Sequence, residues 1–364
     1  MKNELIERLI DLAIAIQQIP APTFHEAQRA DFVRGRFVAE GLPVEVDELS
    51  NVYARVQGSG KGAPVVACAH LDTVFPQSVD LAAQREPERI HGPGLGDNAL
   101  GVAGLFGLLW RLQADGVNLP GDLWLVANAC EEGLGDLRGI RRVVERFRER
   151  PAAYLIVEGM ALGQVYHRAL GVRRQRISVH TSGGHSWIDY GQPSAIHELT
   201  AISGRITALE LPRQPRTTLN IGVISGGSSV NTIAPEASLD LDLRSEDPAT
   251  LEGLAGKVQA IVQAAEKPGV LCGLELIGQR PAGEIPADHP LVQKAVRVLR
   301  ELDIEPRLNI GSTDANIPLS LGLPAVTIGL TTGGKAHTVH EFINLPPLRT
   351  GLEQLVRLTG MLWD

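Results

Sequence analysis

Histidines and acidic residues follow four short apolar runs of this sequence, at the points where each run gives way to a polar or glycine-rich loop. The runs, rich in Val, Ile, Leu and Ala, span residues 63–69, 122–129, 152–157 and 324–330. The histidines and acids that follow them are His70, Asp72, Glu131, Glu132, Glu158 and His337. Imidazole and carboxylate donors without a cysteine suit zinc, cobalt or manganese. The residue types therefore predict a centre for two divalent metal ions, whose chemistry is hydrolysis.

The segment AHLDT places Asp72 two positions after His70. In an extended chain such side chains project to the same side, so the Asp72 carboxylate is predicted to accept a hydrogen bond from the His70 ring. A partner of this kind fixes the ring for metal binding. The alternative is that Asp72 caps the loop beside a buried histidine.

Asp97 lies among glycines in GPGLGDNALGVAG, shortly before a predicted helix. Glycines leave space for a carboxylate to approach a metal ion without side-chain crowding. The same position also suits a helix N-cap, and the sequence pattern leaves both interpretations open.

Two adjacent acids, Glu131 and Glu132, follow the second apolar run. Neighbouring carboxylates repel each other unless a cation or a proton lies between them. Because neighbouring side chains point apart, one can bind metal while the other faces the reacting water as a general base. The alternative is a pair of solvated acids at the start of a loop.

Two further segments offer candidate metal ligands. Glu158 ends the run YLIVEG, where a buried strand is predicted to meet its loop. Near the C-terminus, the segment GGKAHTVHEFI offers both His337 and His340, and spacing alone does not choose between them.

The four apolar runs are predicted to be buried strands of a mainly parallel, helix-covered sheet, which is an α/β fold. Ligands of such sheets bind beyond the carboxyl ends of the strands. The loops that follow the runs should therefore converge on one crevice.

The middle of the chain has a different pattern, that of a unit over residues 172–282 with the order β-α-β-β-α-β. The predicted elements are strands at 174–181, 217–225, 238–245 and 270–277, and helices at 194–211 and 248–266. In SLDLDLR the leucines alternate with charged residues, as expected for an antiparallel sheet packed on one face. This is the order of a ferredoxin-like domain. Its insertion would leave a discontinuous first domain, residues 1–171 and 283–364.

Charge and composition exclude several classes of protein. The net charge is −8, and no Lys/Arg-rich run could follow a phosphate backbone, so nucleic acid is not an expected partner. The three cysteines are far apart and form no CxxC pair, which favours a reducing cytoplasm. Residues 1–20 mix apolar and charged residues at helical spacing, unlike a signal peptide, and no apolar run is long enough to cross a membrane.

Together these segments resemble the M20 family of metallopeptidases, which includes carboxypeptidases, tripeptide aminopeptidases, aminoacylases and desuccinylases. The resemblance rests on AHLDT, GLGDNALGVAG, ACEEG, the placement of Glu158 26 residues after Glu132, and the closing AHTVHEF. It implies a zinc-exopeptidase-like catalytic domain with an inserted ferredoxin-like dimerisation lid.

The resemblance also implies a role for each residue of the predicted centre. His70, Asp97 and Glu158 would bind one metal ion, and Asp97, Glu132 and His337 would bind the other, with Asp97 bridging. Glu131 would be the general base and Asp72 the acid that orients His70. His337 is preferred to His340 because the family's ligand precedes an acidic residue by four positions, here Glu341. A cis peptide is expected between Asp97 and Asn98.

Three residues of the inserted unit match family segments that contact the substrate. His185, in SGGHSW, would reach the active site of the partner in a homodimer and stabilise the oxyanion. Asn231, in SSVNTIAPE, would contact the substrate, and Arg244, in LDLR, would receive a substrate carboxylate. The alternatives are a surface histidine, a turn asparagine and an ordinary arginine at a strand end.

The expected function is a cytoplasmic two-metal hydrolase. Zinc is the expected ion, and cobalt and manganese suit the same donors. Its expected substrates are small peptides, which it would cleave as a metallo-exopeptidase. An N-acyl amino acid deacylase or a succinyl-diaminopimelate desuccinylase would use the same residues and differ only in the substrate pocket. A binding protein on the same scaffold is the alternative from another class.

Overall fold

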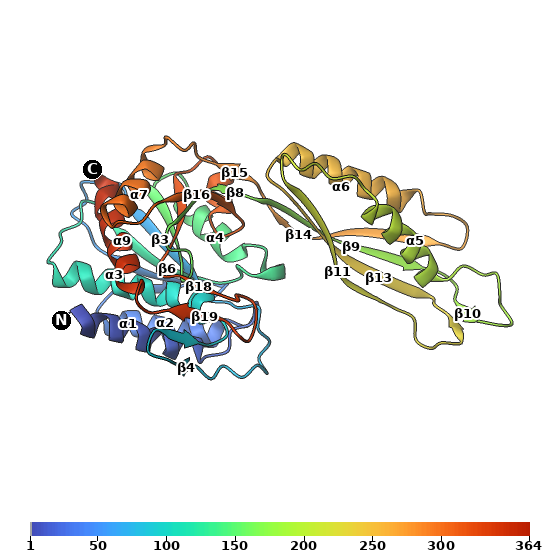
Figure 1. Cartoon of the computed structure of the whole chain (residues 1–364), viewed down its shortest axis with the longest axis horizontal. Coiled ribbons are helices and arrows are strands. Elements are labelled where there is room, and N and C mark those ends of the chain that lie inside the picture. Colours follow the sequence, from blue (N-terminus) through green and yellow to red (C-terminus); the bar gives the residue numbers. More distant parts are fainter. Residues whose placement is uncertain (1) are drawn as a thin grey trace. The chain divides into compact units, whose positions relative to one another are not determined.

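The computed structural model describes residues 2–364. Within it the chain forms two compact units, one built from the residues up to Ala169 together with Gly283–Asp364, and the other from Leu170–Ala282 (Figure 1). Each unit has its own apolar core. The inserted unit begins and ends next to strands of the first unit, at β8 (Gln164–Ala169) and β15 (Gly283–Glu284).

The first unit contains a large mixed sheet whose centre is parallel. Its strand order is β1-β2-β6-β3-β7-β17-β8-β15, with β16 (Arg307–Gly311) paired to β8. The central parallel strands are β6 (Leu123–Asn128), β3 (Val65–His70), β7 (Ala153–Glu158) and β17 (Ala325–Gly329). They are the four apolar runs of the sequence, and the predicted α/β class with a mainly parallel sheet is confirmed. Towards one edge, β2 (Val52–Val56) and β1 (Val44–Val46) continue the sheet antiparallel.

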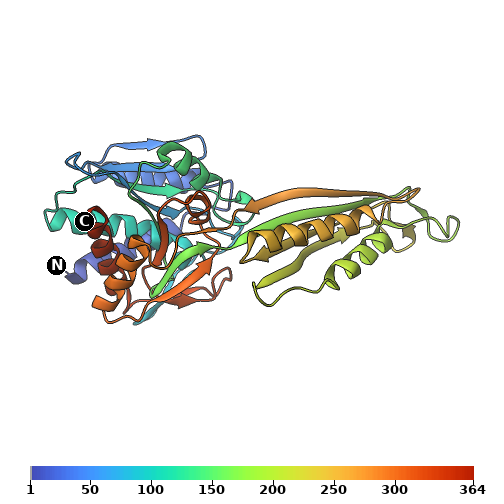
Figure 2. The ribbon, with the colours of Figure 1, turned by 90° about the horizontal axis from the view of Figure 1, so that it is seen from above.

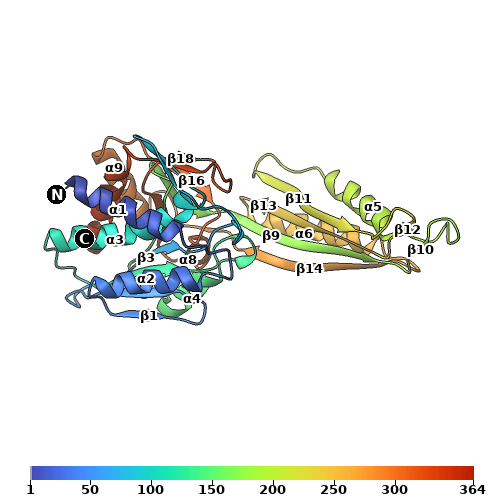
Figure 3. The ribbon, with the colours of Figure 1, turned by 90° about the horizontal axis from the view of Figure 1, so that it is seen from below.

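Helices cover both faces of this sheet. Figure 3 shows α1 (Lys2–Gln17), α3 (Leu100–Ala114) and α9 (Leu348–Gly360) on one side of β3, and α2 (Ala27–Ala39) and α4 (Arg138–Phe147) on the other. Figure 2 shows the same layers from the opposite side. Helix α3 is apolar on all sides as far as Trp110 because it lies between the sheet and other helices. None of the helices described over residues 2–364 is long and apolar enough to span a membrane.

A small antiparallel sheet supports the last candidate ligand. Its order is β18 (Gly333–Gly334), β19 (Phe342–Asn344), β5 (Arg89–His91) and β4 (Gln84–Arg85). The loop that joins β18 to β19 carries His337, whose backbone is left-handed at φ 63°. Pairing of β19 with β5 brings this loop to the segment that precedes Asp97.

The inserted unit is an antiparallel sheet with two helices on one face. The strand order is β11 (Thr217–Gly226), β13 (Glu236–Ser245), β9 (Gly171–His180) and β14 (Leu271–Arg280). Helices α5 (Ala195–Thr207) and α6 (Pro248–Gln263) pack on the leucine face of β13. Along the chain these elements follow the order β-α-β-β-α-β. Helix α5 ends at Thr207, four residues before the predicted limit, Leu211. Pro212 disfavours helical backbone at Leu211 itself.

Candidate metal centre

The candidate ligands lie at the carboxyl edge of the parallel strands. His70 is the last residue of β3 and Glu158 the last of β7, while Glu131 and Glu132 follow the end of β6. Asp97 belongs to a short irregular helical segment, Leu95–Ala99, directly before α3. The structure therefore brings the residues to one edge, as the strand pattern predicts.

The Asp97 carboxylate lies between the two histidines. Its Oδ1 is 3.1 Å from Nε2 of His70, and its Oδ2 is 3.0 Å from Nε2 of His337. Each histidine also faces a second carboxylate: Glu158 Oε2 is 3.8 Å from His70 Nε2, and Glu132 Oε1 is 3.2 Å from His337 Nε2. In each group of three, the possible ligand atoms lie within 4.8 Å of one another. Two three-donor groups that share one carboxylate fit a pair of divalent ions.

Charge within this cluster strongly perturbs its titration. Burial would lower the pKa of His70, but Asp72 and Asp97 raise it well above its usual value. Hydrogen bonds to Asp97 and Glu132 raise the pKa of His337 to about 10. Burial raises the pKa of Glu158 well above its usual value. Because the carboxylates outnumber the two imidazoles, the cluster requires positive charge to balance theirs. Divalent ions would supply this charge in place of protons.

Asn98 positions Asp97 relative to its neighbours. The predicted cis peptide between the two residues is confirmed. The Asn98 side chain donates to the carbonyl of Val157 (2.9 Å) and accepts from the N–H groups of Gly159 (2.9 Å) and Gly101 (3.1 Å). Asn98, and not Asp97, therefore accepts from the first turn of α3, which leaves the Asp97 carboxylate free of a capping role.

The hydrogen bond of the His70 ring differs from the predicted one to the Asp72 carboxylate. Nδ1 of His70 is 3.0 Å from the main-chain carbonyl of Asp72 and 3.6 Å from its carboxylate, so the carbonyl is the nearer acceptor. This hydrogen bond leaves Nε2 facing the Asp97 carboxylate, where it could bind a metal ion. The buried carboxylate instead accepts from the main-chain N–H groups of Glu131 and Glu132, both at 2.9 Å. Asp72 thus orients the acidic pair as well as the histidine loop.

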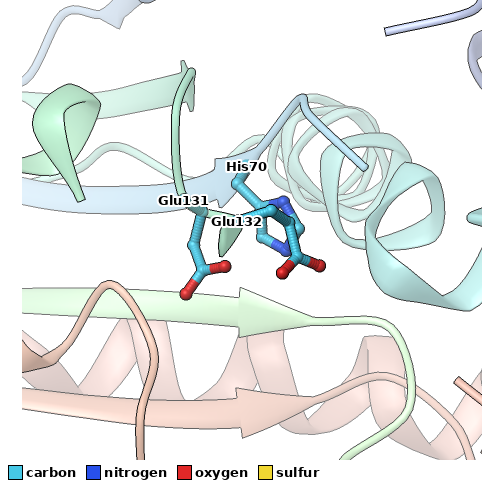
Figure 4. Close-up of side chains that lie close together, drawn as sticks. All are labelled: His70, Glu131 and Glu132. Atoms are coloured by element: carbon cyan, nitrogen blue, oxygen red, sulfur yellow. The ribbon is translucent and has the colours of Figure 1, made fainter. Parts of the chain in front are cut away.

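Glu131 and Glu132 are both buried, with 5% and 7% of their surface exposed. Their side chains leave the backbone in different directions beside the His70 ring (Figure 4). Glu132 contacts His337, whereas Glu131 forms a third close group with His70 and Glu132. Of the two, Glu132 is the one whose carboxylate also belongs to the group with Asp97.

The buried residue Glu341 has a role that the sequence pattern did not reveal. It accepts hydrogen bonds from the main-chain N–H groups of Gly96 (2.7 Å), Asp97 (3.0 Å) and Gly94 (3.2 Å). Burial and the nearby Asp97 charge raise its pKa to about 7. Its spacing from His337 was visible in the sequence, but its contacts with residues more than 240 positions away were not. His340, by contrast, is exposed and lines a different cavity with His91.

The three candidate residues of the inserted unit do not form one cluster. His185 and Asn231 lie at the end of the unit where β10 (Gly184–His185) pairs with β12 (Thr232–Ile233), and the Asn231 carbonyl accepts from Ser186 N–H. Arg244 lies near the other end of β13, about 25 Å along the strand from Glu236. Its guanidinium pairs with Asp242, with Nε 2.7 Å from Oδ1.

Comparisons with known proteins agree with this geometry. Residues 66–360 match the sequence profile of peptidase family M20/M25/M40. The chain is 26% identical over 362 residues to a putative succinyl-diaminopimelate desuccinylase, DapE, of Mycobacterium tuberculosis, which covers 96% of this chain and 98% of that protein. Among solved structures, a tripeptidase of Staphylococcus aureus has a TM-score of 0.83 at 21% identity, with 98% of both chains covered.

A second solved structure is that of the YXEP protein of Bacillus subtilis, a dinuclear metal-binding peptidase of the M20 family. It has a TM-score of 0.68 at 17% identity, with 99% of both chains covered. The profile match spans most of the sequence and confirms the resemblance drawn from its motifs. The chain belongs to peptidase family M20/M25/M40.

Proposed function

We propose that this chain is a two-metal hydrolase that cleaves the amide bond of small peptides from one end, as a metallo-exopeptidase. The observation that carries the proposal is the Asp97 carboxylate between His70 and His337, with one oxygen 3.1 Å and the other 3.0 Å from a ring nitrogen. This arrangement offers two metal positions that share one carboxylate. Zinc is the proposed native ion, and cobalt and manganese suit the same donors.

The ligands are assigned from the two groups of donor atoms. His70, Asp97 and Glu158 would hold one ion, and Asp97, Glu132 and His337 the other. When bound, the ions supply Lewis acidity and lower the pKa of water. Glu341 and Asn98 fix the backbone on either side of Asp97, so the shared carboxylate needs little rearrangement on metal binding.

Glu131 is proposed as the general base. It is adjacent to a metal ligand, and the hydrogen bond from its N–H to Asp72 fixes its backbone. A carboxylate so placed can take a proton from the attacking water and deliver it to the leaving amine. Asp72 is then a positioning residue for both Glu131 and His70.

His185 is proposed to stabilise the oxyanion in the active site of a second copy, in a homodimer formed through the inserted unit. Its Nδ1 accepts from the N–H groups of Trp187 (3.2 Å) and Ile188 (3.4 Å). The neutral ring therefore carries its proton on Nε2, which is the donor that an oxyanion requires. Asn231, at the same end of the unit, is the proposed substrate contact.

Arg244 is proposed to bind a substrate carboxylate. Its hydrogen bonds to Asp242 use Nε and one terminal nitrogen, so the other terminal nitrogen remains available for a carboxylate. The side chain is 40% exposed. The pairing with Asp242 also holds the guanidinium in one orientation.

Removal of one chain's base and another chain's oxyanion donor tests the dimer proposal. A verified mixed dimer of Glu131→Ala and His185→Ala chains is expected to recover measurable activity that neither parent shows, since one site keeps both groups. Peptide hydrolysis by the purified mixed dimer measures this. No recovery in a mixed dimer with full metal content would contradict the trans assignment.

A deacylase acting on N-acyl amino acids is the second candidate. The full-length similarity to a putative desuccinylase supports it. Metal content, measured alongside hydrolysis of di- and tripeptides and of N-acyl and N-succinyl amino acids, separates the two candidates. About two metals per chain with chelator-sensitive peptide cleavage is the expected result. Cleavage confined to N-acyl substrates favours the deacylase, and absence of both metal and turnover favours a binding protein.

We also propose a cytoplasmic location. Cys68, Cys130 and Cys272 are all free, and the first two are buried. Unpaired thiols are usual in reducing compartments.

A further inference from the structure

A segment near the N-terminus contacts both loops that carry the acidic pair and the first histidine. This segment, residues 17–29, connects α1 to the start of α2 and lies outside the residues that match the family profile. The first loop, called here the His70 loop, comprises residues 70–73. The second, called the Glu131 loop, comprises residues 130–132. Both belong to the same compact unit as the segment.

The contacts with the His70 loop begin at Asp72 and Thr73. The Thr23 hydroxyl donates to Oδ2 of Asp72 at 2.9 Å, and the Thr73 N–H donates to the Ala21 carbonyl at 2.9 Å. Pro22 and Thr73 also form a parallel β-bridge. The segment is thus fixed directly to the carboxylate that accepts from the Glu131 loop.

Arg29 adds a buried cation beneath the same loop. Only 1% of its surface is exposed, and its guanidinium donates to the carbonyls of Leu71 (2.6 Å) and Ile19 (2.6 and 2.9 Å). Burial lowers the pKa of Arg29 to about 10, so the group stays charged at neutral pH, with the carboxylates of Asp72 and Glu26 favouring the charge. Leu71 lies between His70 and Asp72, so this contact sets the backbone between a proposed ligand and its positioning acid.

Glu26 makes the corresponding contact with the Glu131 loop. It is 4% exposed, and its Oε1 accepts from the N–H groups of Phe24 (2.9 Å) and Cys130 (3.1 Å). Although Glu26 directly precedes α2, its side chain does not cap that helix. Cys130 and Phe24 both have left-handed backbone, at φ 58° and 74°, which is uncommon for residues with side chains. One buried carboxylate therefore holds two strained positions, one of them directly before Glu131.

We propose that Glu26 and Arg29 are positioning residues that set the spacing between the His70 loop and the Glu131 loop. They act through main-chain atoms and so fix the positions of His70, Glu131 and Glu132. Glu26 and Arg29 themselves contact neither substrate nor metal. The inference rests on the proposed metal centre. The loss of outer contacts of this kind typically weakens metal binding or activity by about 10- to 100-fold.

Glu26→Gln and Arg29→Lys in the full-length protein test this inference. Glutamine keeps the acceptor oxygen but not the charge, and lysine keeps the charge but cannot donate as a fork to two carbonyls. The readouts are zinc affinity by calorimetry, the visible spectrum of the cobalt-loaded protein, and kcat and KM separately. We expect zinc affinity or kcat to fall by about 10- to 100-fold, with an altered cobalt spectrum.

Leu299→Ala is the matched control, because Leu299 is fully buried in α7 (Pro290–Glu301) of the same unit. It is expected to lower thermal stability without changing the two loops, so its cobalt spectrum should equal that of the unmodified protein. If either variant fails to fold, Thr23→Val is measured in its place. This substitution removes only the hydroxyl contact with Asp72, and it should shift the cobalt spectrum in the same direction.

The outcomes separate this inference from the proposed function. Failure of the unmodified protein to bind metal would refute the metal centre itself. If the unmodified protein binds metal but the variants show the spectrum, affinity and kcat of the Leu299→Ala control, the positioning role is wrong and the contacts serve stability alone.

Discussion

Glu131→Ala is expected to lower kcat by about 10²- to 10⁴-fold while the protein keeps both metal ions, as typical general-base contributions imply. The reason is that the two adjacent acids have different roles, one as a metal ligand and the other as the base. The Glu132 carboxylate lies 3.2 Å from His337 and belongs to the group with Asp97, whereas Glu131 belongs to neither group of proposed ligands. Steady-state hydrolysis and elemental analysis of the same preparation measure the two effects.

Two further variants make this test specific. Glu131→Gln keeps the shape of the side chain but cannot accept a proton, so it should lose as much kcat as alanine. Glu132→Ala should lose metal, because it removes one of three donors in its group. Glu131 also lies close to His70 and Glu132, and metal loss in Glu131→Ala would identify it as a ligand and overturn its assignment as the base.

Local sequence pattern was sufficient to predict the parallel sheet and the edge at which the candidate ligands meet. Runs that are apolar throughout, such as residues 65–69 of β3, are buried on both faces, and this leaves a strong signal in the sequence. Carboxyl ends of parallel strands share one edge, so the convergence of His70 and Glu158 follows from the parallel direction of β3 and β7. The choice between His337 and His340 did not follow from spacing alone. The family resemblance favoured His337, and in the structure its Nε2 lies 3.0 Å from Oδ2 of Asp97.

The residues that position the centre were harder to predict, because their contacts span the chain. Glu341 binds the backbone of the Asp97 loop, and Glu26 binds Cys130 across 104 positions. A buried acid that accepts main-chain N–H groups looks in sequence like any other acid near a loop. The same difficulty explains the correction at Asp72, where a spacing of two residues correctly placed it beside His70, but its carboxylate turned to the Glu131 loop.

Asp97→Ala is expected to lose both metal ions and all measurable hydrolysis, the largest effect of any single substitution here. Each of its carboxylate oxygens faces a different histidine, so its removal takes a donor from both groups at once. Hydrogen bonds from these histidines hold the pKa of Asp97 well below its usual range despite burial, so the carboxylate is charged and ready for metal at neutral pH.

Metal stoichiometry distinguishes this shared role from that of an ordinary ligand. His337→Ala removes a donor from one group only, so the group of His70, Asp97 and Glu158 stays intact and about one ion should remain bound. Asp31→Asn, an exposed site paired with Arg34, should bind as the unmodified protein does. Elemental analysis after dialysis gives the count for each. Retention of one tightly bound ion by Asp97→Ala would show that the carboxylate serves a single metal, and the two positions would then have to function without a bridge.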